Sequence, residues 1–282
     1  MTGNLLAYNQ VEVPSFMYGT AWKKESTTHL VELAVSAGFT AIDTANQIIH
    51  YDEGLVGKAR LELERTGIRR ETLFLQTKFT PTGGQDHRTP YDASASITTQ
   101  VRQSFESSLE HLHTDYVDSY VLHGPYSRVG LGEADWEVWS AIEEIYESSR
   151  AKMIGISNVN PAQLDLLCER ASIKPMVVQN RCFAVLGWDQ EVREICRANE
   201  IIYQGFSLLT ANRGVLDDPE VQKIASRLAA SPAQVVFRFA MEVGMLPLTG
   251  TTNELHMKED LKAKDLELTS DEVQRILELG SS

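Results

Sequence analysis

Short apolar runs alternate with amphipathic segments eight times along this chain, and this alternation restricts its fold more than any other feature. The apolar runs have the length and composition of buried strands. We expect strands at residues 16–20, 39–42, 73–77, 117–122, 152–156, 176–178, 201–205 and 245–248. A segment with the 3.6-residue periodicity of a helix follows each of them. Strict alternation of strands and helices predicts a parallel sheet covered by helices.

Eight strand–helix units in a chain of 282 residues match a closed (β/α)8 barrel, the TIM-barrel type of α/β fold. We expect a single domain over residues 1–282, because barrels of this size form one domain. Residues 5–13 predict a short N-terminal β-hairpin, and the pairs Asp218-Pro219 and Ser231-Pro232 predict extra helices near the C-terminus. An open doubly wound sheet is the alternative, but no Gly-x-Gly-x-x-Gly follows the first strand, where a dinucleotide fold would need it.

The composition argues against several classes of protein. The formal net charge is −13, with acidic and basic residues interleaved, which disfavours nucleic-acid binding. No run of about 18 apolar residues occurs, so no membrane span is expected, and the first residues lack the basic and apolar regions of a secretory signal. The three cysteines are odd in number and lack metal-binding spacing. We therefore expect reduced thiols, no metal site and a cytoplasmic location.

Polar residues stand where three consecutive predicted strands end. These residues are Asp43, Lys78 and His123, and Tyr51 follows the first of them in the same connection. Each type has an ordinary explanation by itself, since such an aspartate commonly caps a helix, such a lysine is commonly solvated and a loop histidine is commonly hydrogen-bonded. In an α/β barrel, however, all carboxyl ends of the strands lie on the face that carries the active site. Their joint occurrence therefore predicts a catalytic site.

Around these strand ends the sequence resembles the aldo-keto reductases over nearly its whole length. The matching stretches are Tyr18-Gly19-Thr20-Ala21-Trp22, Ala41-Ile42-Asp43-Thr44-Ala45, Gln76-Thr77-Lys78, Leu122-His123-Gly124-Pro125, Gly155-Ile156-Ser157-Asn158, Val178-Gln179-Asn180 and Pro247-Leu248-Thr249-Gly250-Thr251. Each stretch is short, but their order and their places are specific. The resemblance implies an enzyme that reduces an aldehyde or ketone to an alcohol with a nicotinamide cofactor, usually NADPH, on a barrel without a Rossmann domain.

The resemblance also implies catalytic roles. Tyr51 would protonate the developing alkoxide, Lys78 would activate this acid, and Asp43 would be the partner of the lysine. His123 would donate a hydrogen bond that orients the carbonyl. The chemistry agrees, because a phenol with an ordinary pKa near 10 is a weak acid at pH 7, and a neighbouring lysine cation lowers that pKa. A carboxylate then holds the lysine in its charged form.

An insertion leaves two candidates for the acid. The family pattern is Asp-Thr-Ala-x-x-Tyr-x-Asn-Glu, whereas here two more residues separate Asp43 from Glu53. Counting back from Glu53 places His50 at the position of the tyrosine, and Tyr51 is the next residue. We choose Tyr51, because it keeps the acid of the family and an insertion can change the direction of a side chain.

Cofactor contacts also follow from the resemblance. At the nicotinamide and pyrophosphate end they would be Gly19, Thr20, Ala21, Asp43, Ser157, Asn158, Gln179, Phe206, Ser207 and Leu208, with Phe206 stacked on the nicotinamide ring. At the adenine end they would be Gly250, Thr251, His256, Glu259 and Asp260. The basic residues that usually hold a 2′-phosphate are missing there, and Lys258 is expected to be the nearest cation. The helix N-terminus could still bind a phosphate, so NADP(H) is favoured and NAD(H) is not excluded.

The substrate is expected to be a small-molecule carbonyl compound. Its pocket would be lined by the aromatic residues Trp22, Phe79, Tyr126 and Trp136, which suit apolar carbonyl compounds. We expect no nucleic-acid or membrane partner and a monomer or dimer. The alternative function is a catalytically silent barrel that binds the nucleotide and acts as a partner subunit or redox sensor. Turnover of carbonyl compounds separates the two.

Overall fold

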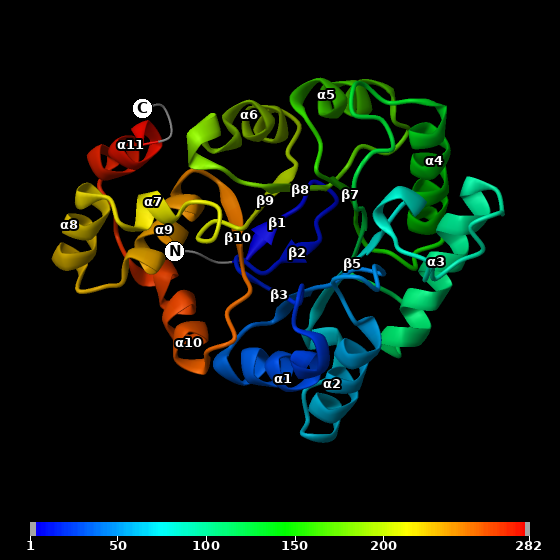
Figure 1. Ribbon diagram of the computed structural model, residues 1–282, viewed down its shortest axis with the longest axis horizontal. Coiled ribbons are helices and arrows are strands. Elements are labelled where there is room, and N and C mark those ends of the chain that lie inside the picture. Colours follow the sequence, from blue (N-terminus) through cyan, green and yellow to red (C-terminus); the bar gives the residue numbers. More distant parts are fainter. Residues whose placement is uncertain (1–3, 280–282) are drawn as a thin grey trace.

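Eight parallel strands close into a barrel, as the alternation in the sequence predicts (Figure 1). The computed structural model describes residues 4–279. Around the barrel the order is β10-β3-β4-β5-β6-β7-β8-β9, so each strand pairs with its neighbour in sequence and β10 closes on β3. The strands are β3 (Met17–Gly19), β4 (Ala41–Asp43), β5 (Phe74–Phe79), β6 (Ser119–Leu122), β7 (Ile154–Ser157), β8 (Val177–Arg181), β9 (Ile202–Phe206) and β10 (Met245–Thr249).

Helices surround the barrel in a ring (Figure 1). After the barrel strands come α1 (Thr27–Ala37), α2 (Glu53–Arg65), α3 (Ile97–Leu112), α4 (Glu133–Glu147), α5 (Pro161–Arg170), α6 (Gln190–Ala198), α9 (Pro232–Glu242) and α10 (Glu254–Lys262). The extra helices expected near the C-terminus are α7 (Arg213–Leu216), α8 (Pro219–Leu228) and α11 (Ser270–Glu278). Proline follows the capping residue in α8 and α9, because its fixed φ suits a first helical turn.

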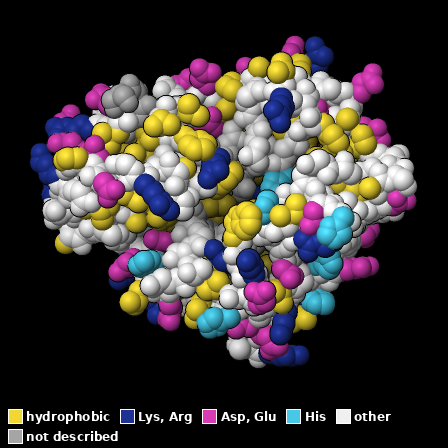
Figure 2. Space-filling model, viewed as in Figure 1, with side chains coloured by type: hydrophobic (Ala, Val, Ile, Leu, Met, Phe, Trp, Pro, Cys, Tyr) yellow, Lys and Arg dark blue, Asp and Glu magenta, His cyan; other side chains and the backbone are white. Residues whose placement is uncertain are grey.

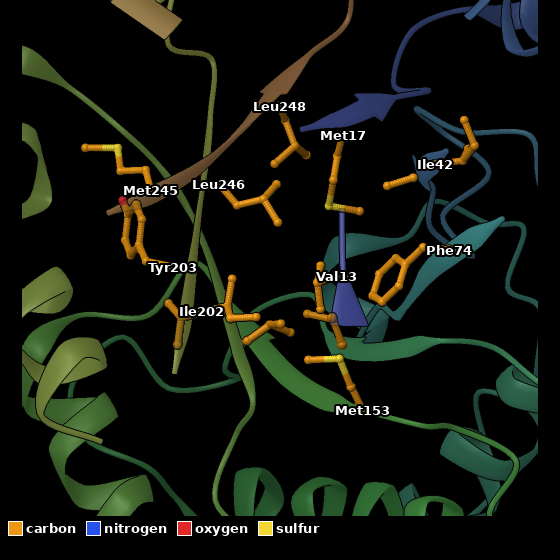
Figure 3. Close-up of a cluster of buried hydrophobic side chains, with 14 of the residues drawn as sticks. Val13, Met17, Ile42, Phe74, Met153, Ile202, Tyr203, Met245, Leu246 and Leu248 are labelled. Atoms are coloured by element: carbon orange, nitrogen blue, oxygen red, sulfur yellow. The ribbon is translucent and has the colours of Figure 1, made fainter. Parts of the chain in front are cut away.

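The predicted N-terminal hairpin closes the end of the barrel at which the strands begin. Its strands β1 (Leu5–Leu6) and β2 (Glu12–Val13) pair antiparallel. Val13 is fully buried and lies beside Phe74, which begins β5, and Met153, which directly precedes β7 (Figure 3). The amino ends of the strands therefore meet a closed apolar layer, and the carboxyl ends remain the open face of the barrel.

The interior changes from apolar to polar toward the carboxyl ends. Side chains alternate along a strand, so Gln76 and Lys78 of β5 point into the barrel, where both bind Asp43. Thr77 points the other way and donates a hydrogen bond to Glu53 at the start of α2. Polar residues in the barrel interior thus mark the end that can hold a ligand.

Two expectations from composition can be compared with the structure. Cys168, Cys182 and Cys196 are buried and form no disulfide, in agreement with reduced core thiols. Within residues 4–279, no helix has the length and apolar character needed to cross a membrane.

Helices α2 and α3 approach so closely at Gly57 that a side chain has no room. A Cβ at this position would lie 1.9 Å from the carbonyl oxygen of His111. We expect Gly57→Ala to lower the free energy of unfolding by about 1–3 kcal/mol, the usual cost of overpacking, as measured by denaturant titration. Gly214→Ala in α7 is the matched control, because its Cβ would meet nothing within 4 Å. Equal stabilities of the two variants would contradict this account of the helix contact.

Candidate active site

Asp43 and Lys78 form a buried ion pair inside the barrel. Asp43 ends β4 and Lys78 stands near the end of the adjacent β5. Nζ of Lys78 lies 2.6 Å from Oδ1 of Asp43 and 2.8 Å from the carbonyl oxygen of Thr44. Burial lowers the pKa of Lys78, and the charge of Asp43 opposes that shift by favouring the ammonium form.

The ring of Tyr51 packs against this pair. Nζ of Lys78 lies 5.4 Å from the ring centroid, and the imidazole of His123 lies 5.9 Å from it, edge to face. Burial raises the pKa of Tyr51, and the negative charge of Asp43 raises it further. The expectation that this pKa is lowered is therefore not met in the net shift, which burial and Asp43 both raise. Tyr51 consequently keeps its proton at neutral pH.

The other candidate for the acid, His50, points away from the ion pair. Its ring centroid lies 4.0 Å from that of Trp22, and its Nδ1 lies 2.6 Å from Oε1 of Gln47. The amide of Tyr51 donates to the carbonyl oxygen of Gln47 at 3.0 Å, which closes a turn over the inserted residues. Burial lowers the pKa of His50. The structure thus brings Tyr51, and not His50, to Lys78.

His123 is held as a neutral imidazole beside Tyr51. Its Nδ1 shares a 2.7 Å hydrogen bond with Oγ1 of Thr80. Burial and the nearby Lys78 cation lower the pKa of His123 to about 3. With Nδ1 occupied by Thr80, Nε2 is the atom that His123 can offer to a ligand. Sequence reasoning missed Thr80, although its position two residues after Lys78 places it on the same side of the chain.

Three buried glutamines form a hydrogen-bond network at the carboxylate of Asp43, which two of them contact directly. Nε2 of Gln76 and Nε2 of Gln179 lie 2.8 and 3.1 Å from its Oδ1, the same oxygen that binds Lys78. Gln204 in turn accepts hydrogen bonds from both glutamines. The sequence analysis singled out Gln179 and missed Gln76 and Gln204. Their signal was a polar side chain within an apolar strand, at a position that points into the barrel.

Several residues expected at the nicotinamide end lie around this network. Gly19 ends β3, and Oγ1 of Thr20 donates to the carbonyl oxygen of Asp43 at 2.9 Å. Ala21 follows Thr20 in the same turn. Oγ of Ser157 donates to the carbonyl oxygen of Gln179 at 2.6 Å. The carboxyl ends of β3, β4, β7 and β8 therefore bring these residues to one face of the barrel.

Asn158 and the loop after β9 complete this part of the site. Nδ2 of Asn158 donates to the carbonyl oxygen of His123 at 2.8 Å, which ties β7 to β6. Asn158 and Ser207 have left-handed φ values of 54° and 57°, a strained conformation that is common at functional sites. Phe206 ends β9 and is partly exposed, whereas the side chain of Leu208 is buried and leaves only its backbone for a ligand.

The residues expected at the adenine end lie after β10 and along α10. Four of them are exposed or partly exposed: Gly250, Thr251, His256 and Glu259. Asp260 is instead buried, and its carboxylate accepts a 2.8 Å hydrogen bond from Oγ1 of Thr249. Burial raises the pKa of Asp260 to about 6. Its side chain therefore links α10 to β10 by a hydrogen bond.

A cation that the sequence analysis missed lies at this end of the site. Nζ of Lys23 donates to the carbonyl oxygen of Gly250, and burial lowers the pKa of Lys23. Lys258, which was expected to be the nearest cation, pairs instead with Glu254 at 2.6 Å. Lys23 approaches from the loop after β3, far away in sequence but adjacent to β10 in the closed barrel. Lys258 as the cation nearest to a 2′-phosphate stays a prediction.

The expected substrate contacts divide into two groups. Trp22 is 65% exposed and Tyr126 is 36% exposed, and both lie in loops at the open face. Phe79 is fully buried and packs on Tyr91, with 5.6 Å between ring centroids, because it points away from the interior that Lys78 faces. Trp136 lies within α4 and packs partly against the core. Trp22, Tyr126 and the partly exposed Trp136 remain candidates for contact with a substrate, whereas the buried Phe79 does not.

The open face of the barrel is hollowed near its centre. Figure 2 shows hydrophobic and histidine side chains bordering this hollow, and Lys and Arg side chains around part of its rim. Lys23 lies in the loop after β3, Arg213 begins α7 after β9, and Arg181 ends β8. Strands β8, β9, β10 and β3 are consecutive around the barrel. Basic residues thus gather on one side of the face, although the chain as a whole is acidic.

Comparisons with known proteins agree with the fold. The model of the aldo/keto reductase family matches residues 15–281. An uncharacterized oxidoreductase, YtbE, from Bacillus subtilis is 32% identical over 272 residues, which cover 95% of this chain and 90% of that protein. A glyoxal reductase from the same organism is 30% identical over 273 residues, with the same coverage. A crystal structure of an aldo/keto reductase from Brucella melitensis superposes with a TM-score of 0.84, at 27% identity over 99% of this chain and 100% of that one.

An ion pair, a phenol and an imidazole thus lie at the carboxyl ends of the strands of an α/β barrel, the face that carries the active site in enzymes of this fold. With the family match over nearly its whole length, the chain belongs to the aldo/keto reductase family.

Proposed function

We propose that this chain reduces an aldehyde or ketone to the alcohol with NADPH, and that Tyr51 donates the proton. The observation that carries the proposal is the position of Tyr51, whose ring faces both the Asp43–Lys78 ion pair and His123. An acid, a cation and a neutral hydrogen-bond donor thereby converge on one point of the open face. This set meets the needs of an alkoxide that gains a proton.

The residues at the carboxyl ends of the strands fit a nicotinamide cofactor. Ser157 and Gln179 are polar side chains buried in the barrel, and amides and hydroxyls of this kind can hold a carboxamide. Gly19 has no side chain, so the backbone at the end of β3 is open to a ligand. When bound, the reduced nicotinamide supplies the hydride for the reaction.

The protein supplies the proton and the orientation. The raised pKa of Tyr51 keeps its hydroxyl protonated, so the acid is ready in the resting enzyme. Lys78 offsets the charge that Tyr51 would acquire on giving up its proton. When Thr80 donates to Nδ1 of His123, Nε2 carries the ring proton and can donate to a carbonyl oxygen. Asp43 keeps Lys78 in place and charged.

The proposal predicts consumption of NADPH with aldehydes and α-dicarbonyl compounds, and glyoxal belongs in the panel because of the relative of that name. NADPH should bind more tightly than NADH, by a margin that shrinks with added salt. That margin should be modest, since one charge-assisted hydrogen bond contributes about 1.5–3 kcal/mol and Lys258 is already paired with Glu254. Initial rates and dissociation constants at two salt concentrations check this. A preference for NADH would contradict the cofactor assignment, and binding without turnover would support the silent barrel.

The pH dependence separates the two candidate acids. Tyr51 stays protonated because its pKa is raised, and His123 stays neutral because its pKa is about 3. We therefore expect kcat for reduction to be flat from about pH 5 to about pH 8, and to fall at higher pH when Lys78, whose pKa is lowered, loses its charge. A histidine acid would lose its proton as the pH rises through the lowered pKa of His50. A rate that falls steadily above about pH 6 would identify His50 as the donor.

A further inference from the structure

A closed hydrogen-bond network of amides crosses the barrel interior beneath the proposed nicotinamide site. Gln204 of β9 pairs in register with Gln179 of β8 and also reaches Gln76 of β5 on the other side of the barrel. Oε1 of Gln204 accepts from Nε2 of Gln76 at 2.7 Å and from Nε2 of Gln179 at 3.0 Å. Nε2 of Gln204 donates back to Oε1 of Gln76 at 3.0 Å. All three side chains are buried.

The number of protons in this network determines which way the oxygen and the nitrogen of each amide face. An amide nitrogen has two protons. Those of Gln179 go to Asp43 and Gln204, and those of Gln76 go to the same two partners. Gln179 can therefore offer only Oε1 to a ligand. If Gln179 turned over, its Oε1 would face Oδ1 of Asp43 and Oε1 of Gln204 with no proton between them, although Lys78 and Gln76 would still donate to the other two oxygens.

We propose that Gln204 is a positioning residue for the cofactor, which acts through Gln179. By accepting a proton from Gln179, it directs Oε1 of Gln179 outward, ready to accept a hydrogen bond from the carboxamide NH2 of the nicotinamide. The proposal rests on the proposed function, because it requires a nicotinamide at this face. Gln204 would then contribute to binding the nicotinamide end of the dinucleotide and not the adenine end.

The same network links the cofactor site to the acid. Oδ1 of Asp43 accepts hydrogen bonds from Lys78, Gln76 and Gln179, so three donors stabilise its negative charge. A rotation of Gln179 would remove one donor from Asp43 at the same time as it presents the wrong group to the nicotinamide. Through Gln179, Gln204 therefore affects both the hydrogen bond to the carboxamide and the number of donors that stabilise Asp43.

The test compares two ligands that differ only in the nicotinamide. Gln204→Met keeps the approximate volume of the side chain and removes its polar atoms. Dissociation constants are measured for NADPH and for 2′-phospho-ADP-ribose, which is the same molecule without the nicotinamide. We expect the constant for NADPH to rise about tenfold, the effect of about one hydrogen bond, and the constant for 2′-phospho-ADP-ribose to stay the same.

Two further variants make the result specific. Gln100→Met removes another buried glutamine, which binds the backbone of Ala93 and Ala95 near α3. It should leave both constants unchanged. Gln204→Glu supplies an acceptor at any pH and a donor only when its carboxyl is protonated. Because the acceptor for Gln179 is kept, Gln204→Glu should bind NADPH more tightly than Gln204→Met, a rescue that the loss of packing alone would not give.

The outcomes separate this inference from the proposed function. Wild-type affinity of Gln204→Met for NADPH, or an equal loss for both ligands, overturns the role of Gln204 alone. A roughly tenfold weaker affinity of Gln204→Glu for NADPH overturns it as well, because the acceptor is still present, and this result can be read even if Gln204→Met fails to fold. Failure of the wild-type chain to bind NADPH overturns the proposed function and the inference with it.

Discussion

Tyr51→Phe is expected to lower kcat for carbonyl reduction by about 10²–10⁴-fold, the usual contribution of general acid catalysis, while the affinity for NADPH barely changes. The variant keeps the ring that packs against His123 and lies over Lys78, and removes only the hydroxyl. Steady-state kinetics with a saturating aldehyde, together with a dissociation constant for NADPH, measure both quantities. The loss should fall on kcat, because the hydroxyl contributes mainly in the transition state.

His50→Phe is the control for this experiment. Phenylalanine can keep the stack on Trp22, and the hydrogen bond that is lost joins His50 to Gln47 and not to the ion pair. We expect a mild effect on kcat. If His50→Phe abolishes turnover while Tyr51→Phe remains active, the histidine is the donor. The assignment of the acid in the inserted segment would then have to be reversed.

The sequence was sufficient for the fold, because barrel topology depends on periodic patterns. Buried strands and amphipathic helices alternate in order, and the model has the eight-stranded barrel, the hairpin and the extra helices. Three site residues could also be located without coordinates. Asp43, Lys78 and His123 end consecutive strands, and in a closed barrel such positions must share one face.

Side chains that meet across the barrel could not be paired from the sequence. Gln76 and Gln204 are 128 positions apart, and their contact depends on which strands face each other through the interior. Lys23 reaches Gly250 only because β10 closes on β3. Phe79 was expected at the substrate as one of four aromatic residues that would line an apolar pocket. Alternation along β5 instead turns it outward.

The inserted segment shows a different limit. Counting residues could not decide between His50 and Tyr51, because adjacent side chains point in different directions. The decision depends on a turn in which the amide of Tyr51 binds the carbonyl of Gln47, and on the contact between His50 and Trp22. The net pKa of Tyr51 was equally out of reach, since it depends on how burial compares with the charge of Lys78.

Lys78→Met is expected to lower kcat as much as Tyr51→Phe, because the phenolate that forms would lose its neighbouring cation. The double variant should be little worse than either single one, since residues that act as a unit are not additive. The lysine variant should also be less stable. Removal of one partner from a buried pair costs about 3–5 kcal/mol, and here the donors Gln76 and Gln179 remain on Asp43. We therefore expect the lower end of that range in denaturant titrations at neutral pH.

Adding Asp43→Asn to Lys78→Met separates stability from catalysis. Without its lysine, the buried Asp43 carboxylate would have a pKa above its unfolded value of about 4. The single variant should then be relatively most stable below that unfolded pKa, and should lose stability as the pH rises through the folded one. Asparagine carries no charge, so the double variant should regain stability at neutral pH and show a weaker pH dependence, while kcat stays low. If kcat recovers together with stability, the role of Lys78 is structural. If neither recovers, the buried charge of Asp43 is not the source of the instability.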